Sequence, residues 1–172
     1  MSPPRPIDGP ASHDLSGALK SPMGWDSIFR VVRQASRAVV GRERYGLSLA
    51  LADLPPHLGA YWQVTGNFIV MNQGMVDLVR RRGSPIEFNS FVFVVLTHEY
   101  LHTLGFLDEA SARRQTARVA RASFGPGHPA TRMAEGDLWQ MYPEFATIVP
   151  GDGRRIRPVR DFDRSVTDRY IR

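Results

Sequence analysis

The sequence predicts a single domain of the α+β class. Its 172 residues, 42% of them hydrophobic, suffice for one sizeable core and are too few for a multidomain enzyme. Several long stretches repeat apolar residues at helical spacing, whereas two shorter stretches show the alternation or the branched and aromatic runs of strands. We therefore expect helices and a small sheet that share one core.

The amino-terminal part combines an arm with a first helix. Residues 1–22 are rich in proline, glycine and serine and lack an apolar period, so burial offers little to offset the entropy of ordering them. From Trp25 onward apolar residues recur at helical spacing, and Asp26 stands where a carboxylate complements the helix dipole. The pattern predicts a mobile arm over 1–22 and a helix over 25–40 that Gly41 ends.

Strand patterns follow this helix. Residues 45–52 alternate as a strand does until Pro55-Pro56 stops the pattern. Residues 60–71 contain two short runs of aromatic and branched residues around Gly66-Asn67, a pair typical of tight turns. We expect a strand and then a hairpin.

Two helices are predicted next, and the second is the more apolar. Asn72 is placed to cap a short helix that ends at the arginine cluster 80–82. Residues 84–87, Ser-Pro-Ile-Glu, match a capping box with proline in the first turn. The segment that follows is apolar on most sides up to Gly105, which predicts a helix buried at the centre of the domain.

The remaining chain predicts two more helices and a basic tail. Residues 108–124 repeat apolar positions with arginines on the other face, and Gly-Pro-Gly-His-Pro at 125–129 breaks the pattern. An apolar group at 138–145 indicates a short helix that docks on the body. From 150 to 172 the chain is sparse in apolar residues and rich in arginine. The expected domain therefore covers residues 23–149.

Composition limits the chemistry that is available. The 22 basic against 17 acidic residues give a net charge of +5, which favours acidic partners. With no cysteine, disulfide scaffolds, thiol nucleophiles and thiolate metal sites are excluded, so any metal must be held by His, Asp or Glu. No apolar run approaches the ~20 residues of a membrane span, and the first residues lead into no apolar signal segment. We expect a cytoplasmic protein without a membrane partner.

The buried helix contains the motif H-E-x-x-H as His98, Glu99 and His102. Two histidines four residues apart lie one turn above each other, so both imidazoles reach one ion, while the adjacent glutamate projects to the side where an activated water would sit. Polar groups buried without partners cost about 1–3 kcal/mol each, and a shared ion supplies those partners. The pattern predicts Zn²⁺ bound by His98 and His102.

This helix resembles the active-site helix of the zincin metallopeptidases. The longer reading H-E-x-x-H-x-x-G-x-x-D, with Gly105 and Asp108, resembles the extended metzincin motif in its snapalysin variant, in which aspartate replaces the usual third histidine. A glycine at that position lets the chain turn sharply after the helix. The resemblance implies a zincin-like domain, with a small twisted mixed sheet packed on the buried helix, and Asp108 as the third metal ligand.

The third ligand has several candidates. Asp108 is the first, but an acidic residue at a helix start also serves as a cap. Glu109 approaches the ion if Gly105 begins a tight helical hairpin, as in the glutamate-zincins. His128 and Glu135 are more distant, because they lie beyond a helix that carries the chain about 22 Å away.

The resemblance also implies supporting features. Residues 68–71 are the candidate edge strand that pairs with an extended substrate. Met133 is a better candidate than Met141 for the methionine expected beneath the metal. Tyr142, Tyr45 or an arginine is a candidate for stabilising the oxyanion.

The expected function is therefore zinc-dependent hydrolysis of peptide bonds in a peptide or protein substrate, with Glu99 as the general base. The alternative is a catalytically silent zincin-fold protein that binds nucleic acid through its arginine-rich surface. Its support is charge at 80–82, 113–114 and 154–155, with no aromatic residues interleaved.

Overall fold

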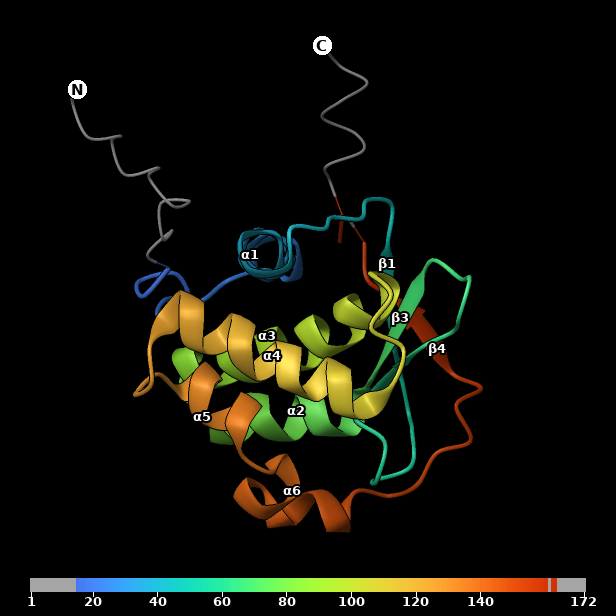
Figure 1. The fold of residues 1–172 in the computed structure, drawn as a ribbon. Helices are drawn as coiled ribbons and strands as arrows, with labels where there is room; N and C mark the ends of the chain where they lie inside the picture. Colours follow the sequence, from blue (N-terminus) through green and yellow to red (C-terminus); the bar gives the residue numbers. More distant parts are fainter. Residues whose placement is uncertain (1–14, 161, 164–172) are drawn as a thin grey trace, which may run out of the picture.

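The computed structural model of the chain describes residues 15–160 and 162–163 (Figure 1). Its elements, in chain order, are α1 Trp25–Val40, β1 Ser48–Ala52, β2 Ala60–Trp62, β3 Phe68–Asn72, α2 Gln73–Arg82, α3 Pro85–Thr103, α4 Glu109–Phe124, α5 Pro129–Glu135, α6 Leu138–Met141, the 3-10 helix η1 Pro143–Thr147 and β4 Ile156–Pro158. The α+β prediction is confirmed. None of the helices within the described residues is long and apolar enough to cross a membrane.

Helix α3 is the centre of the domain. Both of its faces are apolar, and nearly every residue from Asn89 to His102 is buried. Helices α1, α2, α4 and α5 pack around it, and β2 and β3 lie against its remaining side. Figure 1 shows α4 and α5, in yellow and orange, covering α3 on one side while the sheet lies at its end. The predicted central helix is confirmed.

The sheet has four strands in the order β2-β3-β1-β4. Strand β1 runs parallel to β3, with Ser48 opposite Phe68, and antiparallel to β4. Strands β2 and β3 form the predicted hairpin, with Trp62 opposite Ile69. The prediction that 68–71 form an edge strand is wrong, because β3 has a neighbour on each side. Its unbroken apolar run is typical of an interior strand, and β2 is the edge beside α3.

The predicted helix boundaries are supported by the caps that the structure shows. Gly41 ends α1 with a left-handed backbone at φ 68°, which costs glycine little. The Asn72 side chain accepts a hydrogen bond from the Gly74 amide at the start of α2, and Ser84 Oγ accepts one from Glu87 at the start of α3. Helix α5 was not predicted, because it has only seven residues and begins at Pro129, the last residue of the glycine-proline break.

The packed body extends beyond both predicted boundaries, 23 and 149. Leu19 is buried, and its carbonyl accepts a hydrogen bond of 3.0 Å from the Asn89 side chain on α3. Strand β4 pairs with β1, and Phe162 stacks on Phe29 at 4.3 Å between ring centroids. These attachments use single apolar residues and backbone groups, which leave no periodic signal in a sequence. Residues 1–14 of the predicted arm and 164–172 of the predicted tail lie outside the described residues.

Asn72 joins the sheet to the loop that borders the site. Its side-chain amide nitrogen donates to the carbonyls of Leu54, Pro55 and Leu58 at 3.0–3.3 Å, while its oxygen caps α2. The residue is 1% exposed, so each of these groups would be costly to leave without a partner. Asn72 therefore holds the loop 54–58 in place.

We expect Asn72→Ala to lower the free energy of unfolding by about 2–4 kcal/mol, because it removes a cap and leaves buried carbonyls without donors. Asn72→Asp keeps the capping oxygen but turns a second oxygen toward three carbonyls, so it should be at least as destabilising. Urea unfolding followed by circular dichroism measures both, with the exposed cap variant Ser84→Ala as the control. If Asn72→Asp is as stable as the wild type, Asn72 contributes to stability by helix capping alone.

Candidate metal centre

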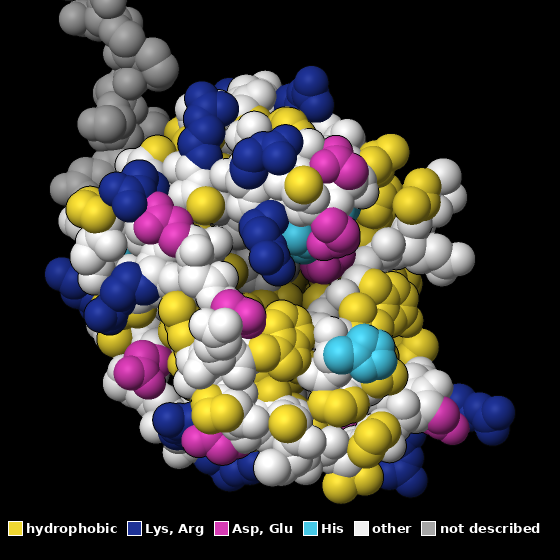
Figure 2. All heavy atoms as spheres, turned by 60° about the horizontal axis from the view of Figure 1, so that its bottom comes forward, with side chains coloured by type: hydrophobic (Ala, Val, Ile, Leu, Met, Phe, Trp, Pro, Cys, Tyr) yellow, Lys and Arg dark blue, Asp and Glu magenta, His cyan; other side chains and the backbone are white. Residues whose placement is uncertain are grey.

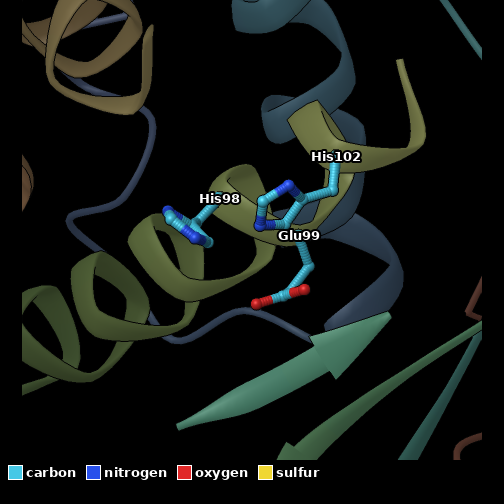
Figure 3. A group of neighbouring side chains, drawn as sticks. All are labelled: His98, Glu99 and His102. Atoms are coloured by element: carbon cyan, nitrogen blue, oxygen red, sulfur yellow. The ribbon is translucent and has the colours of Figure 1, made fainter. Parts of the chain in front are cut away.

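The carboxyl-terminal half of α3 carries the three residues of the motif on neighbouring positions of one helix. The ligand atoms of His98, Glu99 and His102 all lie within 4.8 Å of one another. The two imidazole rings meet edge to face, with centroids 4.8 Å apart. Figure 3 shows both rings on the same side of α3 and the Glu99 carboxylate beside them, directed toward the neighbouring strand. The predicted cluster is therefore present as a geometric group.

A tight turn follows α3 and reverses the chain into α4. The Phe106 amide donates to the Leu101 carbonyl at 3.1 Å, and Gly105 has φ 105°, a conformation that favours glycine. Arg42 donates to the Leu104 carbonyl at 3.0 Å and covers the Phe106 ring. The turn therefore places the start of α4 beside the end of α3.

This hairpin brings Glu109 to the histidines. Its Oε2 lies 3.0 Å from His98 Nε2, and its Oε1 lies 3.1 Å from His102 Nε2. Asp108 is directed elsewhere, because its Oδ1 accepts a hydrogen bond of 2.8 Å from the Ser111 amide and caps α4. The Ser111 hydrogen bonds lower the pKa of Asp108. Of the two adjacent acids, Glu109 is the one that reaches the histidine pair.

The other two candidates for a third ligand lie away from this cluster. His128 caps α5, where its Nδ1 accepts a hydrogen bond from the Ala130 amide, and its ring stacks on Phe124. Glu135 forms a two-bond ion pair with Arg121. Both residues are therefore occupied by local contacts within the α4–α5 unit.

The arrangement of donor atoms fits a bound cation. His102 Nδ1 lies 2.7 Å from the Phe106 carbonyl, so this nitrogen carries the proton that it donates, and the Nε2 lone pair faces the cluster. That lone pair then faces a Glu109 oxygen, and two acceptors in contact require a proton or a metal ion between them. Ligands of a tetrahedral ion at about 2.0–2.1 Å are about 3.3–3.4 Å apart, close to the separations seen here. The residues present therefore fit Zn²⁺.

Glu99 lies in an environment that favours its neutral form. The residue is 6% exposed, and the pKa of its carboxyl is raised to about 7, chiefly by burial and also by the charge of Glu109. His102 and a hydrogen bond from the Trp62 backbone amide of β2 act in the opposite direction. A carboxyl that titrates near neutrality can both accept and return a proton.

A cleft of about 390 Å³ opens beside the cluster and is lined by His98, Glu99 and Glu109 at one side. Its other walls come from the loop 57–60, from α3 and from the α5–α6 region, and most of their side chains are apolar. Figure 2 shows this hollow with hydrophobic side chains inside it and histidine, acidic and basic side chains along its border. Met133 lines the cleft and is buried, whereas Met141 is exposed.

The candidates for stabilising the oxyanion differ in whether they line the cleft. Tyr142 packs against Phe91 and Phe145, and Tyr45 lies under the Arg33 guanidinium, so neither ring lines the cleft. Arg113, one turn after Glu109, does line it. Sequence reasoning left this residue among the surface arginines, and its position four residues after a candidate ligand was the signal that could have identified it.

Comparison with known proteins adds no assignment. No protein-family model, no curated protein and no solved structure matches the chain.

We expect Glu109→Gln to weaken Zn²⁺ binding by at least about tenfold, because the amide lacks the charge of a ligating carboxylate. Asp108→Asn is the matched control, since asparagine caps a helix as well as aspartate does and should leave the affinity unchanged. Competition with a chelating dye measures both dissociation constants. A loss confined to Asp108→Asn would instead give Asp108 the role of third ligand.

Proposed function

We propose that this protein is a zinc-dependent metallopeptidase. The observation that carries the proposal is the convergence of His98, His102 and Glu109 beside the buried carboxyl of Glu99, at the side of an apolar cleft. Two histidines and one glutamate form a ligand set known from catalytic zinc sites, which leave a fourth position open. The motif-based resemblance to zincins supports the same function. The contacts of Glu109 with both imidazoles favour it over Asp108, which the resemblance implied, as the third ligand.

Each side chain has a separate task in this proposal. Nε2 of His98, Nε2 of His102 and the Glu109 carboxylate would hold Zn²⁺, which supplies a Lewis acid that polarises a carbonyl and makes water more acidic. The Phe106 carbonyl orients the His102 ring through Nδ1. The turn at Gly105 keeps α4 at the distance that Glu109 needs.

Glu99 would move the proton. Its carboxylate takes a proton from the attacking water and passes it to the nitrogen that leaves when the peptide bond breaks. The pKa of this carboxyl is raised to about 7, chiefly by burial, so the protonated and the charged forms are both populated near neutral pH.

We expect Glu99→Gln to retain zinc and to lose peptidase activity by about 10²-fold or more, the usual scale for a general base. Elemental analysis measures the retained zinc, and mass spectrometry of a peptide library measures the loss of cleavage. Glu135→Gln, a change at an exposed ion pair, is the control and should keep both properties. Unchanged hydrolysis in Glu99→Gln would assign the activity to another site or to a contaminant.

Removal of zinc should lower the melting temperature. An ion bound by the folded state alone stabilises it by about 2.7 kcal/mol at a concentration 100 times its dissociation constant, or several degrees for a chain of this size. Melting in chelator and then with added Zn²⁺ measures the shift, and His98→Ala should show none. Equal melting temperatures with and without bound ion would show that apolar packing alone holds the α3–α4 hairpin.

A further inference from the structure

Arg113 places a positive charge at the cleft, one helical turn beyond Glu109. Four residues of α-helix correspond to a rise of about 6 Å, and both side chains line the same cleft. Among the described residues that line the cleft, Arg113 is the only arginine or lysine.

The guanidinium of Arg113 is available to a ligand. Glutamate and arginine four residues apart on a helix commonly pair, yet Glu109 faces the two histidines instead. The neighbouring Arg114 donates to Ser111 Oγ at 3.1 Å, whereas Arg113 has no hydrogen bond or ion pair with the described residues. Asp137, the remaining acid of the cleft, caps α6 through the Trp139 amide.

The apolar lining of the cleft suits an apolar side chain next to that charge. Its walls beyond the metal cluster are formed by hydrophobic residues of α2, α3, α5, α6 and η1, namely Met75, Phe91, Val94, Val95, Met133, Leu138, Trp139 and Phe145. Trp139 Nε1 donates to the Pro56 carbonyl at 2.8 Å, and the ring lies 3.8 Å from the place where a Cβ of Gly59 would stand. This contact joins two walls of the cleft, the loop 55–59 and α6.

We propose that the site releases single apolar residues from the carboxyl ends of peptides, with Arg113 binding the terminal carboxylate. This inference rests on the proposed function and specifies its substrate class. A planar guanidinium binds a carboxylate through two parallel hydrogen bonds, which neutral peptide groups cannot match. The apolar walls would hold the last side chain of the peptide.

Cleavage of the last peptide bond uses the same groups as the proposed function. Hydrolysis consumes one water, forms a carbon–oxygen bond and breaks the carbon–nitrogen bond. The water proton passes through Glu99 to the nitrogen of the released amino acid.

Paired peptides test the proposal directly. Two acetylated tetrapeptides that end in phenylalanine are compared, one with a free carboxylate and one with an amide, using zinc-loaded full-length protein and mass spectrometry of the products. Wild type should release phenylalanine from the acid at least about tenfold faster than phenylalaninamide from the amide. Arg113→Gln should lower kcat/KM for the acid by roughly 10- to 100-fold and leave the amide unaffected, and Arg114→Gln should change neither.

Two outcomes would overturn the role of Arg113. Equal rates for the acid and the amide in wild type would show that the site does not select chain ends. Equal losses for both peptides in Arg113→Gln would place the guanidinium at the reacting carbonyl instead.

A binding measurement separates this inference from the proposed function. Trp139 lines the cleft, so the change in tryptophan fluorescence that is lost in Trp139→Phe reports binding of acetyl-phenylalanine and of acetyl-phenylalaninamide to zinc-free protein. The acid should bind more tightly than the amide in wild type and in Arg114→Gln, and this preference should disappear in Arg113→Gln.

If neither tetrapeptide is cleaved, the peptidase proposal fails. The fluorescence comparison then decides on its own whether Arg113 recognises a carboxylate, and equal binding of acid and amide would overturn it.

Discussion

The enclosure of α3 is the constraint on which the rest of the structure depends. A helix that is apolar on both faces must be covered on nearly all sides, and α1, α2, α4, α5 and the sheet edge share that task. The elements that cover its last turns are the ones that carry the other parts of the site. Glu109 and Arg113 come from α4, the Trp62 amide from β2, and Met133 from α5. Burial of one helix thus assembles the candidate metal centre.

The two adjacent acidic residues at the start of α4 make different contacts. The first turn of a helix has free amide groups, and the side chain of the N-cap residue is the one that can reach them. Asp108 occupies that position, so its carboxylate turns back to the Ser111 amide. Glu109, one position later and one methylene longer, extends across the turn to both imidazoles. Asp108 therefore caps α4, and Glu109 contacts the histidine pair.

Burial and nearby charges shift the pKa values of Glu99 and His98 at the candidate centre. Glu99 is buried among apolar residues and is close to Glu109, both of which favour its neutral form, while a β2 amide and His102 favour its charged form. Burial, the nearby His102 and the Arg113 charge lower the pKa of His98, whereas Glu109 raises it, and a neutral imidazole is the form that ligates a metal ion. Arg113 gives the adjoining apolar cleft its only cation from arginine or lysine among the described lining residues.

The sequence by itself determined the helix over 25–40, the hairpin around Gly66-Asn67, the caps at Asn72 and Ser84 and the cluster of His98, Glu99 and His102. All of these depend on periodicity or on contacts within a few residues along the chain. Only the tertiary structure decided that β3 is interior, that residues near Leu19 and Phe162 join the core, and that Glu109 rather than Asp108 faces the histidines. These features depend on how distant segments pack and on the angle at which α4 leaves the Gly105 turn. No local pattern encodes that angle, because many side-chain contacts set it together.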